Sequence, residues 1–308
     1  MTTPAATFPL DEYRALRSGY GVVQLADWSS VTLRGADRQA FLSNFCTNDV
    51  KRLAPGEHCE AFITNVKGKI IGHGLVHCRV SELVFVSVPA QAPKIIAHLE
   101  RYIIREDVQL RDTTAERKYL LIAGGESAGA GLNGETWIRW RLLHVPFCGL
   151  LEATPDRLSL VQQELNASGA TSCGGEVFDA LRIESGTPLF GVDFDEENLP
   201  QEVGRDELAI SFTKGCYLGQ ETVARIDALG HVNQRLVGVR FAGPKVPEAK
   251  SKLTHEGTPA GHVTSAAYSP QLSSPLALAM VRRQSLAPGS QLESATGPCE
   301  VIGLPMHL

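Results

Sequence analysis

The sequence predicts an α+β protein in which two ferredoxin-like halves precede a small C-terminal β-barrel. The first observation is an order of strand, helix, strand, strand and helix that occurs twice before residue 184. The second is a change of character near residue 235, beyond which short apolar runs alternate with Gly, Pro and Ser without a helical period. A chain of 308 residues is long enough for two or three packed units. We therefore expect the two halves over residues 1–235 and the barrel over residues 236–308.

The elements of the first half follow from hydrophobic periodicity. Residues 60–66 and 70–76 alternate apolar and polar side chains around Lys67-Gly68-Lys69, which predicts a hairpin with a glycine-containing turn. Pro93 opens a helix with an apolar stripe on one face. The remaining elements expected in this half are strands at 31–34 and 83–88 and a helix that begins near Asp37.

The second half and the barrel are predicted in the same way. The glycine-rich residues 124–134 contain neither Gly-Lys-Ser/Thr nor a dinucleotide fingerprint, so we expect a flexible connection there and no phosphate loop. The elements expected in the second half are strands at 119–122, 137–143, 148–153 and 210–213, and helices from Pro155 and over 175–183. The strands expected in the barrel are 237–241, 261–266, 276–281 and 299–302.

Composition excludes several classes of function. The net charge of −5 and the absence of a lysine-arginine run disfavour nucleic acid as a direct partner. No apolar stretch approaches the ~20 residues that cross a bilayer, so we expect no membrane association. The N-terminal residues resemble neither a signal peptide nor a transit segment, which favours a cytoplasmic protein. The seven cysteines are scattered and form no Cys-x-x-Cys pair, which predicts reduced thiols and neither a zinc site nor a disulfide framework.

Residues 214–225, Lys-Gly-Cys-Tyr-Leu-Gly-Gln-Glu-Thr-Val-Ala-Arg, are the most informative stretch for function. Their two glycines permit sharp turns and the close approach of another molecule. Lys214 and Arg225 supply cations that favour the thiolate of Cys216, the form of a thiol that acts as nucleophile or metal ligand. Most intracellular cysteines are small buried hydrophobes, and such a cysteine needs none of these neighbours. We therefore expect an exposed, electropositive thiol at the edge of a pocket.

Other polar and aromatic residues have less specific surroundings. Glu184 lies on an amphipathic helix, where a carboxylate could accept hydrogen bonds from an aminopyrimidine ring. Trp28 could fill a core or stack on a flat heterocycle, and its sequence context favours the core. Most of the acidic run at 193–197 is expected to be a solvated loop. His73 and His77 lie in one strand, about 13 Å apart, so they cannot share a metal ion and are expected to be ordinary sheet histidines.

Residues 214–225 resemble the signature of the YgfZ family, folate-binding proteins of iron–sulfur cluster maturation. The resemblance extends over most of the chain and includes the C-terminal barrel that this family shares with the glycine-cleavage T-protein. The further segments that carry it are 41–50, 67–70, 181–188, 199–202 and 261–265. It implies three subdomains arranged as a ring around a central channel that binds tetrahydrofolate or a folate derivative.

One departure from the T-protein bears on the reaction. Aminomethyltransferases carry an acidic residue just after the glycine hairpin, beside the reacting folate nitrogen, whereas this chain has Ile71-Gly72-His73-Gly74. Without that carboxylate, proton handling at the folate amine loses its main component. Glycine cleavage is therefore not expected, although pterin binding can persist.

The resemblance implies a tetrahydrofolate-binding factor that assists the assembly or repair of iron–sulfur clusters in client enzymes, tRNA-modifying enzymes among them. Its partners would be folate and iron–sulfur client proteins or assembly factors. Cys216 would be the working thiol, while Lys214 and Arg225 would stabilise its anion and attract the folate glutamate tail. The cofactor-binding positions expected are Trp28, Asn48, Glu184, Gly215, Tyr217, Gln220 and Glu221. Two alternatives stay open: one-carbon transfer or demethylation on a small amine with folate as acceptor, and a passive folate-binding scaffold.

Overall fold

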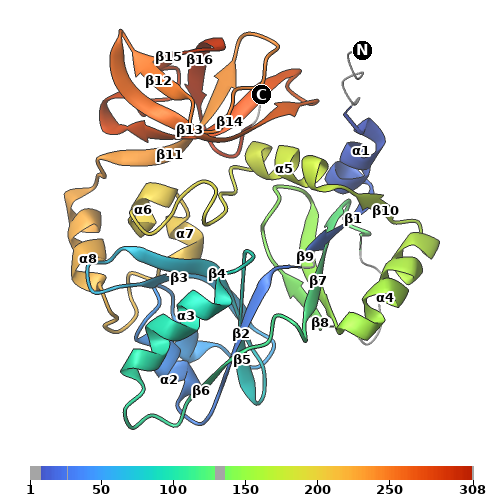
Figure 1. Ribbon diagram of the computed structural model, residues 1–308, viewed down its shortest axis with the longest axis vertical. Coiled ribbons are helices and arrows are strands. Elements are labelled where there is room, and N and C mark those ends of the chain that lie inside the picture. Colours follow the sequence, from blue (N-terminus) through green and yellow to red (C-terminus); the bar gives the residue numbers. More distant parts are fainter. Residues whose placement is uncertain (1–7, 26, 129–135, 307–308) are drawn as a thin grey trace.

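Two five-stranded sheets and a closed six-stranded barrel surround a common centre (Figure 1). A computed structural model describes residues 8–25, 27–128 and 136–306 of the protein. The barrel lies at the top of the view, with one sheet below it on each side of the molecule. The predicted fold class, ferredoxin-like sheets with a C-terminal barrel, is thereby confirmed.

The first sheet contains the predicted hairpin. Strands β3 (His58–Thr64) and β4 (Ile70–Cys78) pair antiparallel around a turn in which Gly68 has a φ of +75°, a conformation that favours glycine. His73 and His77 both lie in β4, as expected. The other elements of this unit are β2 (Ser29–Arg34), β5 (Glu82–Ser87), β6 (Gln109–Asp112), α2 (Arg38–Ser43), α3 (Ala92–Leu99) and the short helices η1 (Val50–Arg52) and η2 (Glu100–Tyr102). The strand order is β3-β4-β5-β2-β6.

The second sheet contains a strand from the start of the chain. Strand β1 (Tyr20–Leu25) lies between β10 (Thr171–Cys173) and β7 (Lys118–Gly124), and α1 (Leu10–Ser18) packs beside it. The two halves are therefore interleaved in sequence, an arrangement that the repeated pattern from residue 31 onward did not predict. The other elements are β8 (Thr136–Arg139), β9 (Phe147–Ala153), α4 (Pro155–Ala167) and α5 (Gly175–Glu184).

Residues 200–229 connect the second sheet to the barrel through three helices. These helices are α6 (Pro200–Val203), α7 (Asp206–Ala209) and α8 (Gln220–Leu229). The strand predicted at 210–213 is wrong: these residues form a turn-containing loop, and the Ser211 amide donates to the Thr47 carbonyl at 2.9 Å. The strand predicted at 137–143 ends at Arg139. Most of the predicted connection at 124–134 lies outside the described residues.

The barrel closes with the strand order β11-β14-β13-β12-β15-β16. Its elements are β11 (Gln234–Phe241), β12 (Lys252–His255), β13 (Thr258–Ser269), β14 (Ser274–Arg282), η3 (Arg283–Ser285), β15 (Gln291–Ser294) and β16 (Gly297–Ile302). Helix α5 packs beneath it through Ile183, which belongs to an apolar cluster with Leu236 and Met280. No helix in the described ranges is long and apolar enough to cross a membrane.

The prediction of a solvated loop at 193–197 is wrong for Asp193, which is buried and connects α5 to the barrel through hydrogen bonds. Its Oδ2 accepts from Arg182 at 2.8 Å, and its Oδ1 accepts from the hydroxyls of Thr264 and Ser265 at 2.7 and 2.6 Å. These donors satisfy the hydrogen-bonding capacity of the buried carboxylate. The remaining acidic residues of the run, at 195–197, are exposed as expected.

Candidate functional site

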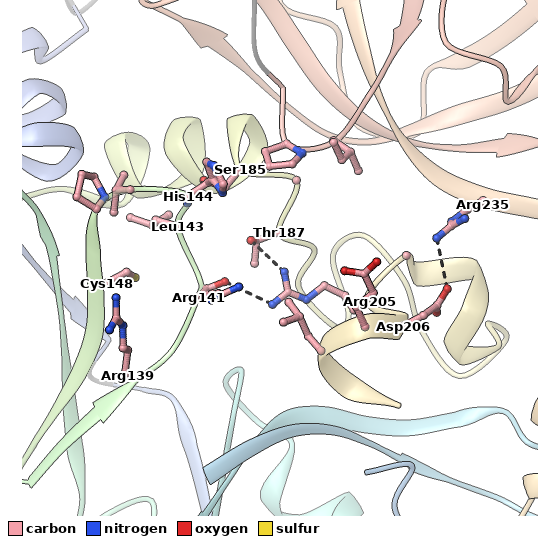
Figure 2. A pocket seen from close by; sticks show the side chains of 18 residues that line it. Arg139, Arg141, Leu143, His144, Cys148, Ser185, Thr187, Arg205, Asp206 and Arg235 are labelled. Carbon is pink, nitrogen blue, oxygen red and sulfur yellow. Dashed lines mark hydrogen bonds and ion pairs between the residues drawn. The ribbon is translucent and has the colours of Figure 1, made fainter. Parts of the chain in front are cut away.

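A cavity of about 930 Å³ lies where the three units meet. Figure 2 shows that its walls come from β8 and the segment after it, from the end of α5, from α7 and from the first barrel strand. Ligand pockets typically have volumes of about 300–1,000 Å³, so this cavity can hold a molecule of cofactor size. The charged and titratable residues in its lining are Arg139, Arg141, His144, Cys148, Arg205, Asp206, Glu207 and Arg235.

A buried ion pair supports one wall of the cavity. Arg205 donates from Nε to Glu60 Oε1 at 2.7 Å and from an Nη to Glu60 Oε2 at 2.6 Å. The same carboxylate contacts His73 Nε2 at 2.8 Å and accepts from Trp140 Nε1 at 3.0 Å. Although burial opposes its charge, Arg205 and His73 hold the pKa of Glu60 well below its usual range. Glu60 is therefore an ionised structural anchor and not a proton donor at neutral pH.

Asp206 is a cavity-lining carboxyl group with a raised pKa. Its Oδ2 accepts from Arg235 at 3.3 Å, while its Oδ1 has no hydrogen-bond partner among the residues that the structure describes (Figure 2). Burial raises the pKa of Asp206 to about 6; Arg235 opposes this effect, and the negative charges of Asp227 and Glu207 add to it. A carboxyl group with such a pKa can exchange a proton near neutral pH.

Glu184 lies directly behind the cavity, at the end of α5 and next to the lining residue Ser185. The Tyr13 hydroxyl lies 2.9 and 2.8 Å from its two carboxylate oxygens. Burial raises the pKa of Glu184. Glu184, predicted from the sequence as a folate contact, is therefore next to a lining residue, but its own side chain does not line the cavity.

Lys214 is buried and holds the segment that follows α2. Its Nζ donates to the carbonyls of Ser43 at 2.5 Å, Cys46 at 2.7 Å and Asn48 at 3.0 Å. Carbonyls at the C-terminal end of a helix lack intrahelical donors, which explains why a lysine is useful there. An ammonium group has three N–H donors, and these carbonyls use all of them. The structure therefore leaves Lys214 no donor for the Cys216 thiolate, the role expected from the sequence.

Much of the rest of the 214–225 segment also has a packing role. Tyr217 is buried, and the Lys214 ammonium lies 4.9 Å from its ring centroid. Gly219 has a φ of +82°, and a Cβ at this position would lie 2.3 Å from the Asn65 carbonyl oxygen. Gln220 accepts from the Tyr217 amide at 3.3 Å and begins α8. The segment is thus fastened to the turn of the β3–β4 hairpin.

Cys216 is the exposed cysteine among the seven, all of which lie in the described residues. Gly215, Glu221 and Arg225 are exposed as well, and a Cβ at Gly215 would meet nothing within 4 Å. Neither Cys216 nor Arg225 lines the central cavity. The predicted accessibility of the thiol agrees with the structure, but the structure does not bring the thiol to this cavity.

Trp28 and Asn48 are both used inside the protein. Trp28 is buried, and its ring packs edge-on against Trp140 with centroids 5.6 Å apart. The Asn48 amide nitrogen donates to the Glu60 and Leu208 carbonyls at 2.8 and 3.0 Å. Both of its N–H groups are therefore engaged, and neither residue lines the cavity.

The sequence did not single out Glu60, Arg205, Arg139 or Arg141. Glu60 and Arg205 are separated by 145 residues, so no local spacing indicates their contact. The one available signal was the alternation Arg-Trp-Arg at 139–141, which in an extended chain puts the two arginines on one side.

Comparison with known proteins agrees with this architecture. Residues 3–135 match the GCVT N-terminal domain, and residues 234–306 match the glycine cleavage T-protein C-terminal barrel domain. An aminomethyltransferase of Synechococcus sp. (strain RCC307) is 28% identical over 303 residues, which cover 91% of this chain and 84% of the relative. An aminomethyltransferase of Streptomyces avermitilis is 26% identical over 331 residues, which cover 96% of this chain and 89% of the relative.

A solved structure shares the whole fold. The glycine cleavage system aminomethyltransferase T from Bartonella henselae superposes with a TM-score of 0.87 at 20% identity, over 98% of this chain and 91% of that chain. At this identity the likeness concerns the fold alone. The chain is thus similar to the two T-protein domain models over two separate regions, and it shares the fold of this solved structure.

Proposed function

We propose that this protein binds tetrahydrofolate in the central cavity and uses it as acceptor or donor in one-carbon transfer involving a small amine. The observation that carries the proposal is a cavity of cofactor size, lined by arginines and backed by the buried Glu184 and Tyr13. The residues present fit the cofactor, because the lining carboxylates of Asp206 and Glu207 can accept hydrogen bonds from the aminopyrimidine edge of a pterin and the lining arginines can bind the carboxylates of a folate tail. The names of the relatives favour this reaction class over the other candidates.

Bound tetrahydrofolate would supply amine nitrogens that carry the one-carbon unit. The chain's own residues would hold the cofactor and handle the proton. Strand β4, which follows the hairpin turn, has no carboxylate. Glu60 contacts His73 in this strand and is held ionised by Arg205. Asp206 is the residue suited to proton exchange, because its pKa is about 6 and it lies in the cavity wall.

The test combines binding with turnover. We expect tetrahydrofolate to bind the protein and small aminomethyl donors (X–CH2–NH2), whose carbon is already at the oxidation level of formaldehyde, to yield methylene-tetrahydrofolate with release of ammonia and XH. As a base, Asp206 must be ionised, so turnover should fall as the pH is lowered through about 6. Asp206→Asn should reduce turnover about 100-fold while changing cofactor affinity less than about threefold. Absence of tetrahydrofolate binding by calorimetry would overturn the proposal.

A second function is favoured by a separate observation, the exposure of Cys216 in its glycine-flanked loop. We propose as the alternative that the folate-loaded protein assists iron–sulfur cluster assembly or repair in client enzymes through this thiol. The buried cysteines are unsuited to such work, since burial raises the pKa of the thiols of Cys46, Cys148 and Cys173.

The Cys216→Ala variant distinguishes one-carbon transfer from thiol-dependent cluster assembly or repair. The exposed side chain makes no packing contact that the fold needs, so unfolding free energy should change by less than about 0.5 kcal/mol. If the thiol works on clusters, Cys216→Ala should abolish support of cluster-dependent enzymes in cells that lack the native protein, with folate affinity intact. Full rescue by the variant would refute the proposed role of the Cys216 thiol in cluster assembly or repair. Rescue together with absent turnover would leave a passive folate scaffold.

A further inference from the structure

The barrel supplies one charged side chain to the carboxyl group proposed as the base. Arg235, the second residue of β11, donates from an Nη to Asp206 Oδ2 at 3.3 Å (Figure 2). Both residues line the central cavity, although one belongs to the barrel and the other to α7. The Oδ1 atom of Asp206 is buried, so the cavity reaches this carboxyl group through Oδ2, the oxygen that Arg235 contacts.

The start of β11 is held against the central unit on both sides of Arg235. The Gln234 side-chain amide donates to Glu202 Oε2 at 3.4 Å, and Leu236 is buried in an apolar cluster. Arg235 itself lies over the turn between α6 and α7, where a Cβ on Gly204 would come within 3.6 Å of its Nε. Because these neighbours fix the strand, the backbone of Arg235 keeps its guanidinium within reach of the α7 carboxyl group.

Three charged groups of the described residues act on the pKa of Asp206, and Arg235 is the cation among them. The other two are carboxylates, Asp227 on α8 and Glu207 beside Asp206 on α7. Burial and these negative charges raise the pKa of Asp206, and Arg235 opposes them. A side chain that acts as a base must be ionised before it can take up a proton. The barrel therefore contributes the charge that keeps this carboxyl group in its working form.

We propose that Arg235 is a positioning residue for the one-carbon transfer, which holds the Asp206 carboxylate ionised and oriented, so that the reaction depends on how the barrel is docked. The inference rests on the proposed function, in which Asp206 is the base, and adds to it a group that acts through that base. Arg235 does not need to touch the cofactor or the amine in this role. Lysine at this position would keep the positive charge without the planar fork of the guanidinium, so it should preserve part of the effect.

The first measurement follows the carboxyl carbon of Asp206 by 13C NMR as the pH is varied, on the full chain, with the signal assigned by its loss in Asp206→Asn. In the native protein it should titrate near pH 6. In Arg235→Gln the midpoint should rise by about one pH unit, and in Arg235→Lys by less than about half of that. An unchanged midpoint in Arg235→Gln would overturn the proposal.

The matched control is Arg282→Gln. Arg282 is an exposed arginine at the end of the neighbouring strand β14, opposite Gln234, and lies outside the cavity lining. This variant removes the same charge from the same part of the barrel without touching Asp206, so the Asp206 midpoint should stay at its native value. An equal rise in both variants would show that the net charge of the barrel is responsible, and would overturn a specific role for Arg235.

The second measurement is the pH dependence of turnover. Because fewer Asp206 carboxylates are ionised at a given pH, Arg235→Gln should lower kcat about fivefold near pH 6, leave it nearly unchanged above about pH 8, and change KM little. In an Asp206→Asn background, Arg235→Gln should cause no further loss. An equal further loss in that background would assign Arg235 a merely structural role and overturn the proposal.

The two measurements separate this inference from the proposed function. If the Asp206 signal shifts in Arg235→Gln while the native protein neither binds tetrahydrofolate nor turns over an aminomethyl donor, the coupling of the pair stands and the proposed function fails. If turnover occurs but its pH dependence does not move with the Asp206 signal, Asp206 is not the base, and the positioning role of Arg235 is overturned.

Discussion

Replacing Glu60 with Gln should destabilise the protein by about 3–5 kcal/mol, the cost of leaving a buried charge without its partner. The change keeps the shape of the side chain but removes the negative charge that Arg205 contacts through two nitrogens at 2.7 and 2.6 Å. Both residues are more than nine-tenths buried, so water cannot replace the lost partner. Urea unfolding should show a lower midpoint with an unchanged dependence on denaturant.

The control for this prediction is the double variant that combines Glu60→Gln with Arg205→Met. Because the double variant no longer contains an unpaired buried charge, it should be more stable than Glu60→Gln alone. The same comparison tests whether the Glu60–Arg205 ion pair supports the cavity wall, since Arg205 precedes the lining residue Asp206 at the start of α7. A single variant that unfolds at the native midpoint would show that the ion pair contributes little.

Replacing Lys214 with Met should destabilise the protein by about 3 kcal/mol. Methionine retains most of the apolar stem but leaves the carbonyls of Ser43, Cys46 and Asn48 without their donor in a buried site. Thermal and urea unfolding measure this loss directly. The prediction assumes that the hydrogen bonds of Lys214 hold the 214–225 segment against the end of α2.

The same variant tests whether Lys214 also activates the thiol. Because the ammonium donors are fully used, the rate at which iodoacetamide alkylates Cys216 should change less than about twofold in Lys214→Met under native conditions. Cys216 can be followed selectively, since it is the exposed cysteine of the chain. Lys214→Gln serves as the matched polar control. A large drop in the alkylation rate, without loss of fold, would return Lys214 to the role expected from the sequence.

The 214–225 segment contains residues with a packing role that the sequence did not predict. Its length suggested a site in which many residues serve one thiol. In the structure, Lys214, Tyr217 and Gly219 instead fasten the loop to α2 and to the hairpin turn. The residues of the segment that remain exposed are Gly215, Cys216, Glu221, Ala224 and Arg225. A signature of this kind records packing as well as chemistry, because presenting one exposed side chain requires a loop fixed on its other side.

The sequence by itself determined the fold class and many of the elements, because hairpin alternation, helical stripes and glycine-containing turns are local properties. It also determined that Cys216 is accessible and that His73 lies in a strand. Only the tertiary structure decided which charges meet. Glu60 meets Arg205 across 145 residues, β1 joins the second sheet, and Asp206 meets Arg235 beside a cavity built from three units. Such contacts depend on how the units pack, and no periodicity along the chain encodes them.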